Sequence, residues 1–125
     1  MNNNEKTLVI LTPGFPASET DFNCLPMQQA LIRSINKNNP ALNIIILSFQ
    51  YPYFKKKYKW YGNTVISFSG RNKGGLPKLM LRKKINAVLK EISKESEIAA
   101  LLSFWHGECA LTGKRFADKT GLKHY

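Results

Sequence analysis

The chain has 125 residues, of which 43% are hydrophobic and 11% aromatic, and this composition predicts one packed domain rather than a disordered chain. Its two cysteines, Cys24 and Cys109, form no close pair, which argues against a disulfide framework and a zinc site. We expect both to be small buried hydrophobic residues. The first residues lack a signal-peptide pattern, and no apolar run approaches the ~20 residues of a membrane helix, so we predict a cytoplasmic chain.

The net charge of +11 is concentrated in one part of the sequence. Residues 51–90 contain no Asp or Glu and eleven basic residues: Lys55, Lys56, Lys57, Lys59, Arg71, Lys73, Lys78, Arg82, Lys83, Lys84 and Lys90. A block of one sign attracts phosphate groups on nucleotides, nucleic acids or anionic membranes. The alternative is that these lysines are solvated, while several of the aromatic residues among them fill the core.

The first part of the chain predicts two strands joined by a helix. A strand is expected over about 7–12 and a helix over about 23–38, with Pro26 in its first turn. The stripe on this helix would consist of Met27, Ala30, Leu31 and Ile35. The next strand, over about 43–49, is apolar without alternation, as in a parallel sheet that helices cover on both faces.

The second part continues the alternation of strands and helices. Turn residues dominate until a short strand at about 64–68, and Gly70, Gly74 and Gly75 then predict a flexible linker. A helix at about 76–93, a strand at about 98–105 and a helix at about 107–120 follow. The order βαββαβα predicts an α/β fold, a Rossmann-like open, mostly parallel sheet with helices on both faces.

The end of the sequence suggests that the chain is part of something longer. Gly121 suits the position just after a helix, and residues 122–125 resemble the approach to another strand. We therefore expect residues 1–125 to be the N-terminal domain of a larger protein.

Two predicted strand ends carry residues suited to ligand binding. His106 follows the last predicted strand, and Gly14 lies in the loop after the first one. Ligands of open α/β sheets bind beyond the carboxyl ends of the strands, so both are candidates. The alternatives are that backbone groups satisfy the His106 ring, that Gly14 serves only a turn, and that Glu19 and Asp21 cap the first helix.

Several common sites are excluded by the motifs that the sequence lacks. It contains no G-x-G-x-x-G after the first strand, no G-x-x-x-x-G-K-[ST] and no G-x-S-x-G. These absences argue against a dinucleotide dehydrogenase, a P-loop enzyme and an α/β-hydrolase.

A family resemblance rests on motifs in a particular order. These are Thr12-Pro13-Gly14-Phe15-Pro16, then Glu19, Asp21 and Leu25-Pro26-Met27-Gln28-Gln29, then Phe104-Trp105-His106-Gly107 with Gly113 and Phe116-Ala117. On these residues the chain resembles the N-terminal domain of a GT-B glycosyltransferase of group 1, also called family 4, over nearly all of its length. Such enzymes transfer a sugar from a nucleotide-sugar donor with retention. Many members carry two adjacent glycines in the first loop, whereas this chain has one.

The resemblance implies one half of a GT-B fold, the acceptor-side domain, with the donor-binding C-terminal domain absent from this chain. The chain alone would then be inactive. His106 would be the catalytic residue facing the donor sugar, and Gly14, Phe15 and Gly107 would contact the donor. The resemblance implies no metal and no cofactor.

The acceptor would be a saccharide or lipid-linked glycan, as in polysaccharide biosynthesis. Acceptor or anionic-surface binding is expected at Lys55, Lys56, Lys57, Lys59 and Trp60, with possible peripheral contact to an anionic membrane. The alternative is a non-enzymatic basic α/β domain that binds nucleic acid or another polyanion. Nucleic acid is the less favoured partner, because the charge is broken across a loop and a helix and no known nucleic-acid motif occupies either. A third interpretation is a freestanding α/β adaptor domain.

Overall fold

The structure, a computed structural model, describes residues 6–105 and 107–125. Its elements, in chain order, are β1 (Lys6–Gly14), α1 (Pro26–Asn38), β2 (Asn43–Tyr51), β3 (Lys56–Trp60), β4 (Asn63–Ser67), α2 (Leu76–Glu95), β5 (Glu97–Ser103) and α3 (Glu108–Thr120). All seven elements expected from the sequence are present, with bounds shifted by at most three residues. The strand β3 is an addition.

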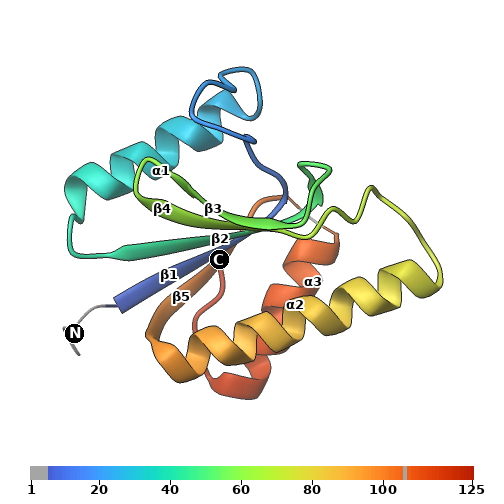
Figure 1. The fold of residues 1–125 in the computed structure, drawn as a ribbon. Helices are drawn as coiled ribbons and strands as arrows, with labels where there is room; N and C mark the ends of the chain where they lie inside the picture. Colours follow the sequence, from blue (N-terminus) through green and yellow to red (C-terminus); the bar gives the residue numbers. More distant parts are fainter. Residues whose placement is uncertain (1–5, 106) are drawn as a thin grey trace.

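The strands form one sheet in the order β3-β4-β2-β1-β5. The pairs β1–β2, β1–β5 and β2–β4 are parallel, while β3 pairs antiparallel with β4. Helix α1 covers one face of the sheet, and α2 and α3 cover the other (Figure 1). The expected α/β class, a mostly parallel sheet with helices on both faces, is therefore confirmed.

The sequence prediction missed β3 and placed turn residues there. Tyr61 and Gly62 both have positive φ, 45° and 80°, and form the two-residue turn from β3 to β4. Such turns join antiparallel strands because their twist matches that of the strands. The signal was the alternation of Lys57, Tyr58, Lys59 and Trp60, which hides one set of side chains and exposes the other.

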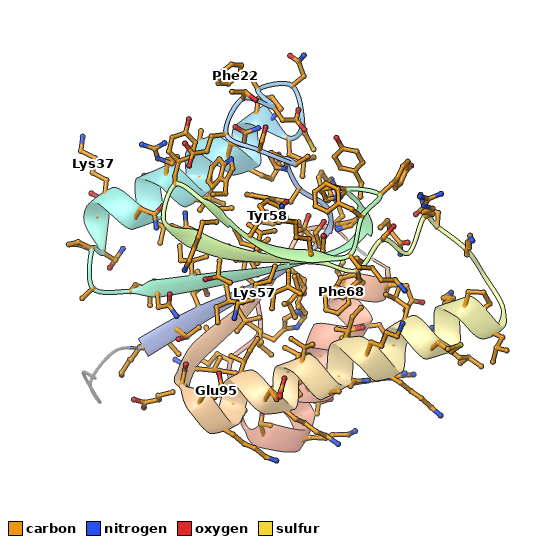
Figure 2. The ribbon with its side chains drawn as sticks, viewed as in Figure 1. Phe22, Lys37, Lys57, Tyr58, Phe68 and Glu95 are labelled. Carbon is orange, nitrogen blue, oxygen red and sulfur yellow. The ribbon has the colours of Figure 1, made fainter. Side chains whose placement is uncertain are left out.

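The core lies in two clusters, one on each side of the sheet. Apolar residues of β1, β2 and β5 meet α2 and α3 on one side, and Ile32 of α1 packs against the other. The prediction of which α1 residues face the core is largely wrong. Met27 is 81% exposed, and only Ile35 of the expected set packs against the core, because α1 turns Ile32 toward the sheet. Phe22 also projects outward from the loop before α1 (Figure 2).

The last residues lie beside β5 as a strand would. The N–H of Leu101 donates to Lys123 O at 2.9 Å, and the N–H of Tyr125 donates to Leu101 O at 2.9 Å. Gly121 ends α3 with a left-handed φ of 76°, as expected. The expectation that residues 122–125 approach a strand position is thus confirmed for the backbone.

His124, for which the sequence suggested no role, packs against α3. Its Nε2 lies 2.7 Å from the Ser103 hydroxyl, which donates to Cys109 O at 3.0 Å. A Cβ on Gly113 would come within 2.6 Å of His124 Nε2, so Gly113 is what lets this ring approach the helix. Among the helices that the structure describes, none is long and apolar enough to cross a bilayer.

Candidate functional site

The carboxyl ends of the parallel strands meet at one edge of the sheet, referred to here as the carboxyl edge. After β1 the chain turns to α1 on one face, and after its neighbour β5 it turns to α3 on the other. Ligands of open α/β sheets bind at such a switch point, because the diverging connections leave a crevice there. The N–H of Phe104 donates to Leu11 O at 2.9 Å, which holds the two strand ends together.

The segment after β1 is more regular than the sequence suggested. Gly14 is the last residue of β1, paired with Tyr51, and it accepts a hydrogen bond from the Thr12 hydroxyl at 2.7 Å. A Cβ on Gly14 would lie 3.5 Å from Tyr51 Cβ, an ordinary contact. Gly14 is therefore not required here by a tight turn or by a positive φ.

Phe15, expected to contact the donor, is a core residue. Its side chain is fully buried, and its ring meets that of Trp60 edge-on with centroids 5.0 Å apart. Its N–H donates to Tyr51 O at 3.2 Å. The Phe15 side chain is thus turned away from solvent, and its structural part is to fix the loop onto the core.

Trp60, expected on a binding surface, is also buried, with 1% of its surface exposed. In β3 the alternation of the pleat turns Tyr58 and Trp60 to the α1 side of the sheet, away from Lys57 and Lys59. The expectation that Trp60 meets an acceptor or a membrane is wrong for this reason. Its indole N–H is buried and has no hydrogen-bond partner among the described residues.

The segment after β5 combines an exposed ring with two unusual backbone conformations. Trp105 is 52% exposed and has φ 65°, a left-handed conformation that costs a non-glycine residue energy. Gly107 has φ 105°, and its carbonyl accepts the N–H of Leu111 at 2.9 Å as α3 begins. His106, the expected catalytic residue, lies outside the described residues.

The loop before α1 is held by polar contacts that the sequence analysis misassigned. Asp21 Oδ2 accepts from the Ala17 N–H and from the Tyr51 hydroxyl, both at 3.2 Å, and Glu19 Oε2 accepts from the Tyr61 N–H at 3.0 Å. Neither acid caps α1, which begins after Leu25 without a side-chain cap. Their role here is to tie the loop to β2 and to the β3–β4 turn.

Three groups stay protonated at neutral pH: Cys24 and Tyr58 near this loop, and Cys109 in α3 on the other face of the sheet. Burial, together with the Asp21 charge, raises the pKa of Cys24 to about 11, although Cys24 is only half-buried. Burial also raises the pKa of Tyr58, whose hydroxyl donates to Pro16 O at 2.6 Å, and that of Cys109 to about 12. These cysteines are not thiolates at neutral pH. Only Cys109 is fully buried, as expected for both.

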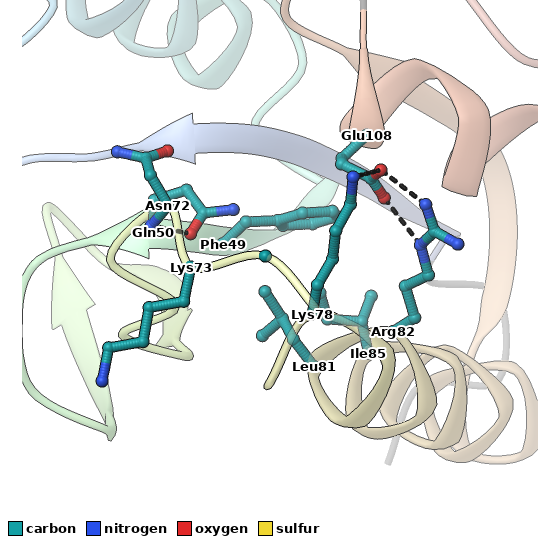
Figure 3. A pocket seen from close by; sticks show the side chains of 10 residues that line it. Phe49, Gln50, Asn72, Lys73, Lys78, Leu81, Arg82, Ile85 and Glu108 are labelled. Carbon is teal, nitrogen blue, oxygen red and sulfur yellow. Dashed lines mark hydrogen bonds and ion pairs between the residues drawn. The ribbon is translucent and has the colours of Figure 1, made fainter. Parts of the chain in front are cut away.

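A pocket of about 180 Å³ opens at the carboxyl edge, beside the end of β2 and the first turns of α2 and α3 (Figure 3). Glu108 binds two cations there: Arg82 donates from Nε at 2.9 Å and from Nη2 at 2.6 Å, and Lys78 Nζ lies 3.0 Å away. The hydrogen bonds from Arg82 and Lys78 lower the pKa of Glu108 to about 2 despite partial desolvation. The carboxylate is therefore a permanent acceptor rather than a proton donor at neutral pH.

The sequence analysis did not assign this pocket to a site. The available signal was the spacing of Lys78 and Arg82, four residues apart on a helix and thus on the same face. That Glu108 would lie between them depends on the crossing of α2 and α3, which no local pattern encodes.

The loop Phe68–Gly75, whose glycines predicted a flexible linker, forms one wall of the pocket, and its first half is held by contacts to β2. The N–H of Gly70 donates to Phe49 O at 2.8 Å, and the N–H of Asn72 donates to the Gln50 side chain at 2.7 Å. A Cβ on Gly70 would lie 2.8 Å from Phe49 O and 2.7 Å from Leu81 Cδ2, so only glycine fits. The non-glycine residues with left-handed φ in this loop are Ser69, Arg71 and Asn72.

The fold divides the basic block of the sequence among separate surfaces. Lys56, Lys57 and Lys59 lie on β3, the edge strand of the sheet, while Lys55 reaches Lys84 of α2 closely enough to lower the pKa of Lys84. Lys78 and Arg82 face Glu108. Lysines on an edge strand also discourage pairing with a second sheet, which is an alternative to a ligand role for the β3 lysines.

The comparisons with known proteins add no assignment: no family model, curated protein or solved structure matches the chain. Within residues 6–105 and 107–125, no three His, Cys, Asp or Glu side chains gather as a metal site requires. Function must therefore be inferred from the geometry of the carboxyl edge and from the sequence motifs.

Proposed function

We propose that the chain is the acceptor-side domain of a cytoplasmic glycosyltransferase that moves a sugar from a nucleotide-sugar donor to a saccharide or lipid-linked glycan. The observation that supports it is the sheet order, which brings the ends of β1 and β5 together at the switch point. These are the two strand ends that carry Gly14 and Gly107. The first and last of the motifs that suggested the family thus follow adjacent strands at one edge of the sheet.

In this proposal the chain positions the nucleotide-sugar donor and stabilises the charge that develops during sugar transfer. Backbone groups near Gly14 and Gly107 approach the donor, and the first turn of α3 presents N–H groups that favour an anion. The neutral His106 imidazole hydrogen-bonds a sugar hydroxyl, or its backbone carbonyl stabilises positive charge developing at the anomeric carbon. The left-handed Trp105 agrees with a functional turn, since strained backbone is concentrated at functional sites.

Contact with an anionic membrane is part of the proposal, and its best support lies beside α2 rather than on β3. Lys55, Lys73 and Lys84 surround a hollow that also contains Met80. Leu76 and Leu79 nearby on α2 are 69% and 53% exposed. Basic residues around exposed apolar side chains suit the headgroup region of an anionic bilayer, where each cation adds about 1 kcal/mol.

The transferase proposal is tested on the protein as its gene encodes it. Purified protein is incubated with a panel of nucleotide sugars and glycan acceptors, and release of the nucleoside diphosphate is measured. His106→Ala should lower turnover by a factor that corresponds to about 2.7–4 kcal/mol, with an unchanged melting temperature. Lys114→Gln, an exposed site on α3, is the control. Absence of turnover with every donor, or wild-type turnover by His106→Ala, contradicts the proposal.

The membrane contact is tested separately by co-sedimentation with vesicles containing anionic lipid. Replacing Lys55, Lys73 and Lys84 by Gln should weaken sedimentation more than replacing Lys56, Lys57 and Lys59, the three β3 members of the set that the sequence alone favoured together with Lys55. A greater loss in the β3 variant would return the membrane surface to β3, equal loss would show attraction by net charge rather than by the surface beside α2, and no binding by the wild type would remove the membrane contact.

A further inference from the structure

A second hollow lies between α2 and α3, and it shares no residue with the pocket at the carboxyl edge. We refer to it as the α2–α3 groove. Its volume is about 590 Å³, and all of its lining residues except Phe116 are exposed, so it opens to solvent. No role assigned above involves it.

The α2–α3 groove is basic along both walls. Its charged lining residues are Lys83, Lys90 and Lys94 from α2 and Arg115 and Lys119 from α3. No acidic side chain lines it, and none of the five cations takes part in an ion pair within the described part of the chain. Two of the five come from α3, so the fold has gathered charge that the sequence spreads over 37 positions.

The floor of the groove is apolar. Ala87 is exposed between the two basic walls, and Phe116, which is 6% exposed, also lines the groove. Because α2 leads into β5 and α3 leaves it, both helices run away from the carboxyl edge. Lys83 and Lys94 are eleven residues apart on α2, or about 16 Å along its axis.

We propose that the α2–α3 groove binds an acidic amphipathic helix of a partner protein. The apolar stripe of such a helix would lie on the exposed Ala87, while carboxylates on its two flanks would meet the cations of both walls. Single-stranded nucleic acid fits less well, since the one aromatic ring of the groove, Phe116, is only 6% exposed and offers no stacking platform. A flat bilayer cannot follow a groove between two helices.

The test uses a fluorescent peptide of about 15 residues, built from Leu, Ala and Glu, with one Leu stripe flanked by Glu on both sides. Its binding to the chain is followed by anisotropy at physiological salt. Replacing Lys90, Lys94 and Lys119 by Gln should weaken binding by about tenfold or more. The matched control replaces Lys6, Lys37 and Lys123, which are exposed and lie outside the groove lining; it removes the same charge elsewhere and should change affinity by less than about twofold.

Two further probes decide between a helix and a general polyanion. A scrambled peptide of the same composition has the same charge but no stripe, and inorganic polyphosphate has charge alone. The proposal predicts clearly weaker binding of both. It is overturned if the stripe peptide does not bind, if either probe binds as tightly, or if both lysine variants lose affinity equally. Thermal unfolding by circular dichroism checks that each variant is folded.

Discussion

Two glycine-containing segments follow parallel strands at the same sheet edge, and they are held in opposite ways. The segment after β1 is fixed by a side chain, because Phe15 is buried against Trp60 while Gly14 has room for a Cβ. The loop after β4 is fixed by the absence of one, since Gly70 lies against Phe49 and Leu81 where no Cβ fits. The number of glycines in a loop thus says little about how firmly the loop is held. The close contacts of each glycine must be compared instead.

The largest effect on stability is expected from a substitution of Phe15. Phe15→Ala should lower the free energy of unfolding by about 3–5 kcal/mol, because it removes a fully buried ring and leaves a cavity beside Trp60. Urea denaturation measures the loss. Phe22→Ala is the control, since Phe22 is 67% exposed, and it should change stability by less than about 0.5 kcal/mol. A loss below about 1 kcal/mol for Phe15→Ala would mean that the ring does not anchor the loop.

The second effect compares the two glycines directly. Gly70→Ala should cost about 1–3 kcal/mol, since its Cβ would press on the Phe49 carbonyl and the Leu81 side chain. Gly14→Ala should stay within about 1 kcal/mol of the wild type in either direction, because its Cβ makes only an ordinary contact with Tyr51. Thermal unfolding of both variants measures the difference. Equal destabilisation would show that the contrast between the two loops is wrong.

The same contrast explains what sequence reasoning could and could not provide. The order of strands and helices, with the continuous apolar run of β2, predicted the fold class, and the glycine after α3 predicted the end of that helix, because burial and left-handed backbone leave strong local signals. The burial of Trp60 was missed because a ring among lysines has the same local pattern in a core and on a surface, and that of Phe15 because the family resemblance placed it against the donor. The Glu108 pair was missed because it joins residues 26 or more positions apart.

The third effect concerns Glu108 of α3, which links α3 to Lys78 and Arg82 of α2. Its folded pKa of about 2 lies below the ordinary value of 4.5, so its ionised form stabilises the fold at neutral pH. That contribution is complete above pH about 4.5 and is lost as the pH falls toward 2; solvent screening reduces it to about 1–2 kcal/mol. Denaturation at pH 7 and at pH 3 measures it.

Glu108→Gln separates this contribution from general acid destabilisation. The variant should be less stable than the wild type at pH 7, and the gap should narrow at pH 3, where the unfolded wild-type chain binds a proton at Glu108 while the folded carboxylate stays mostly ionised. Asp118→Asn, which breaks the exposed pair with Lys114, is the control and should show no such change. A gap that stays constant with pH would mean that the Arg82 and Lys78 contacts do not depress the pKa of Glu108.

The smallest expected effect is at Asn72, where the substitutions test only the left-handed backbone conformation. Asn72 has φ 59°, which Asn tolerates better than most residues and which Ala does not, while its N–H is held by the Gln50 side chain. Asn72→Ala should therefore cost about 1 kcal/mol, whereas Asn72→Gly, which adopts this φ without strain, should stay within about 0.5 kcal/mol of the wild type. Urea denaturation of the two variants gives the difference. If Ala and Gly behave alike, the loop does not hold residue 72 in the left-handed region, and its order rests on Gly70 and Gln50 alone.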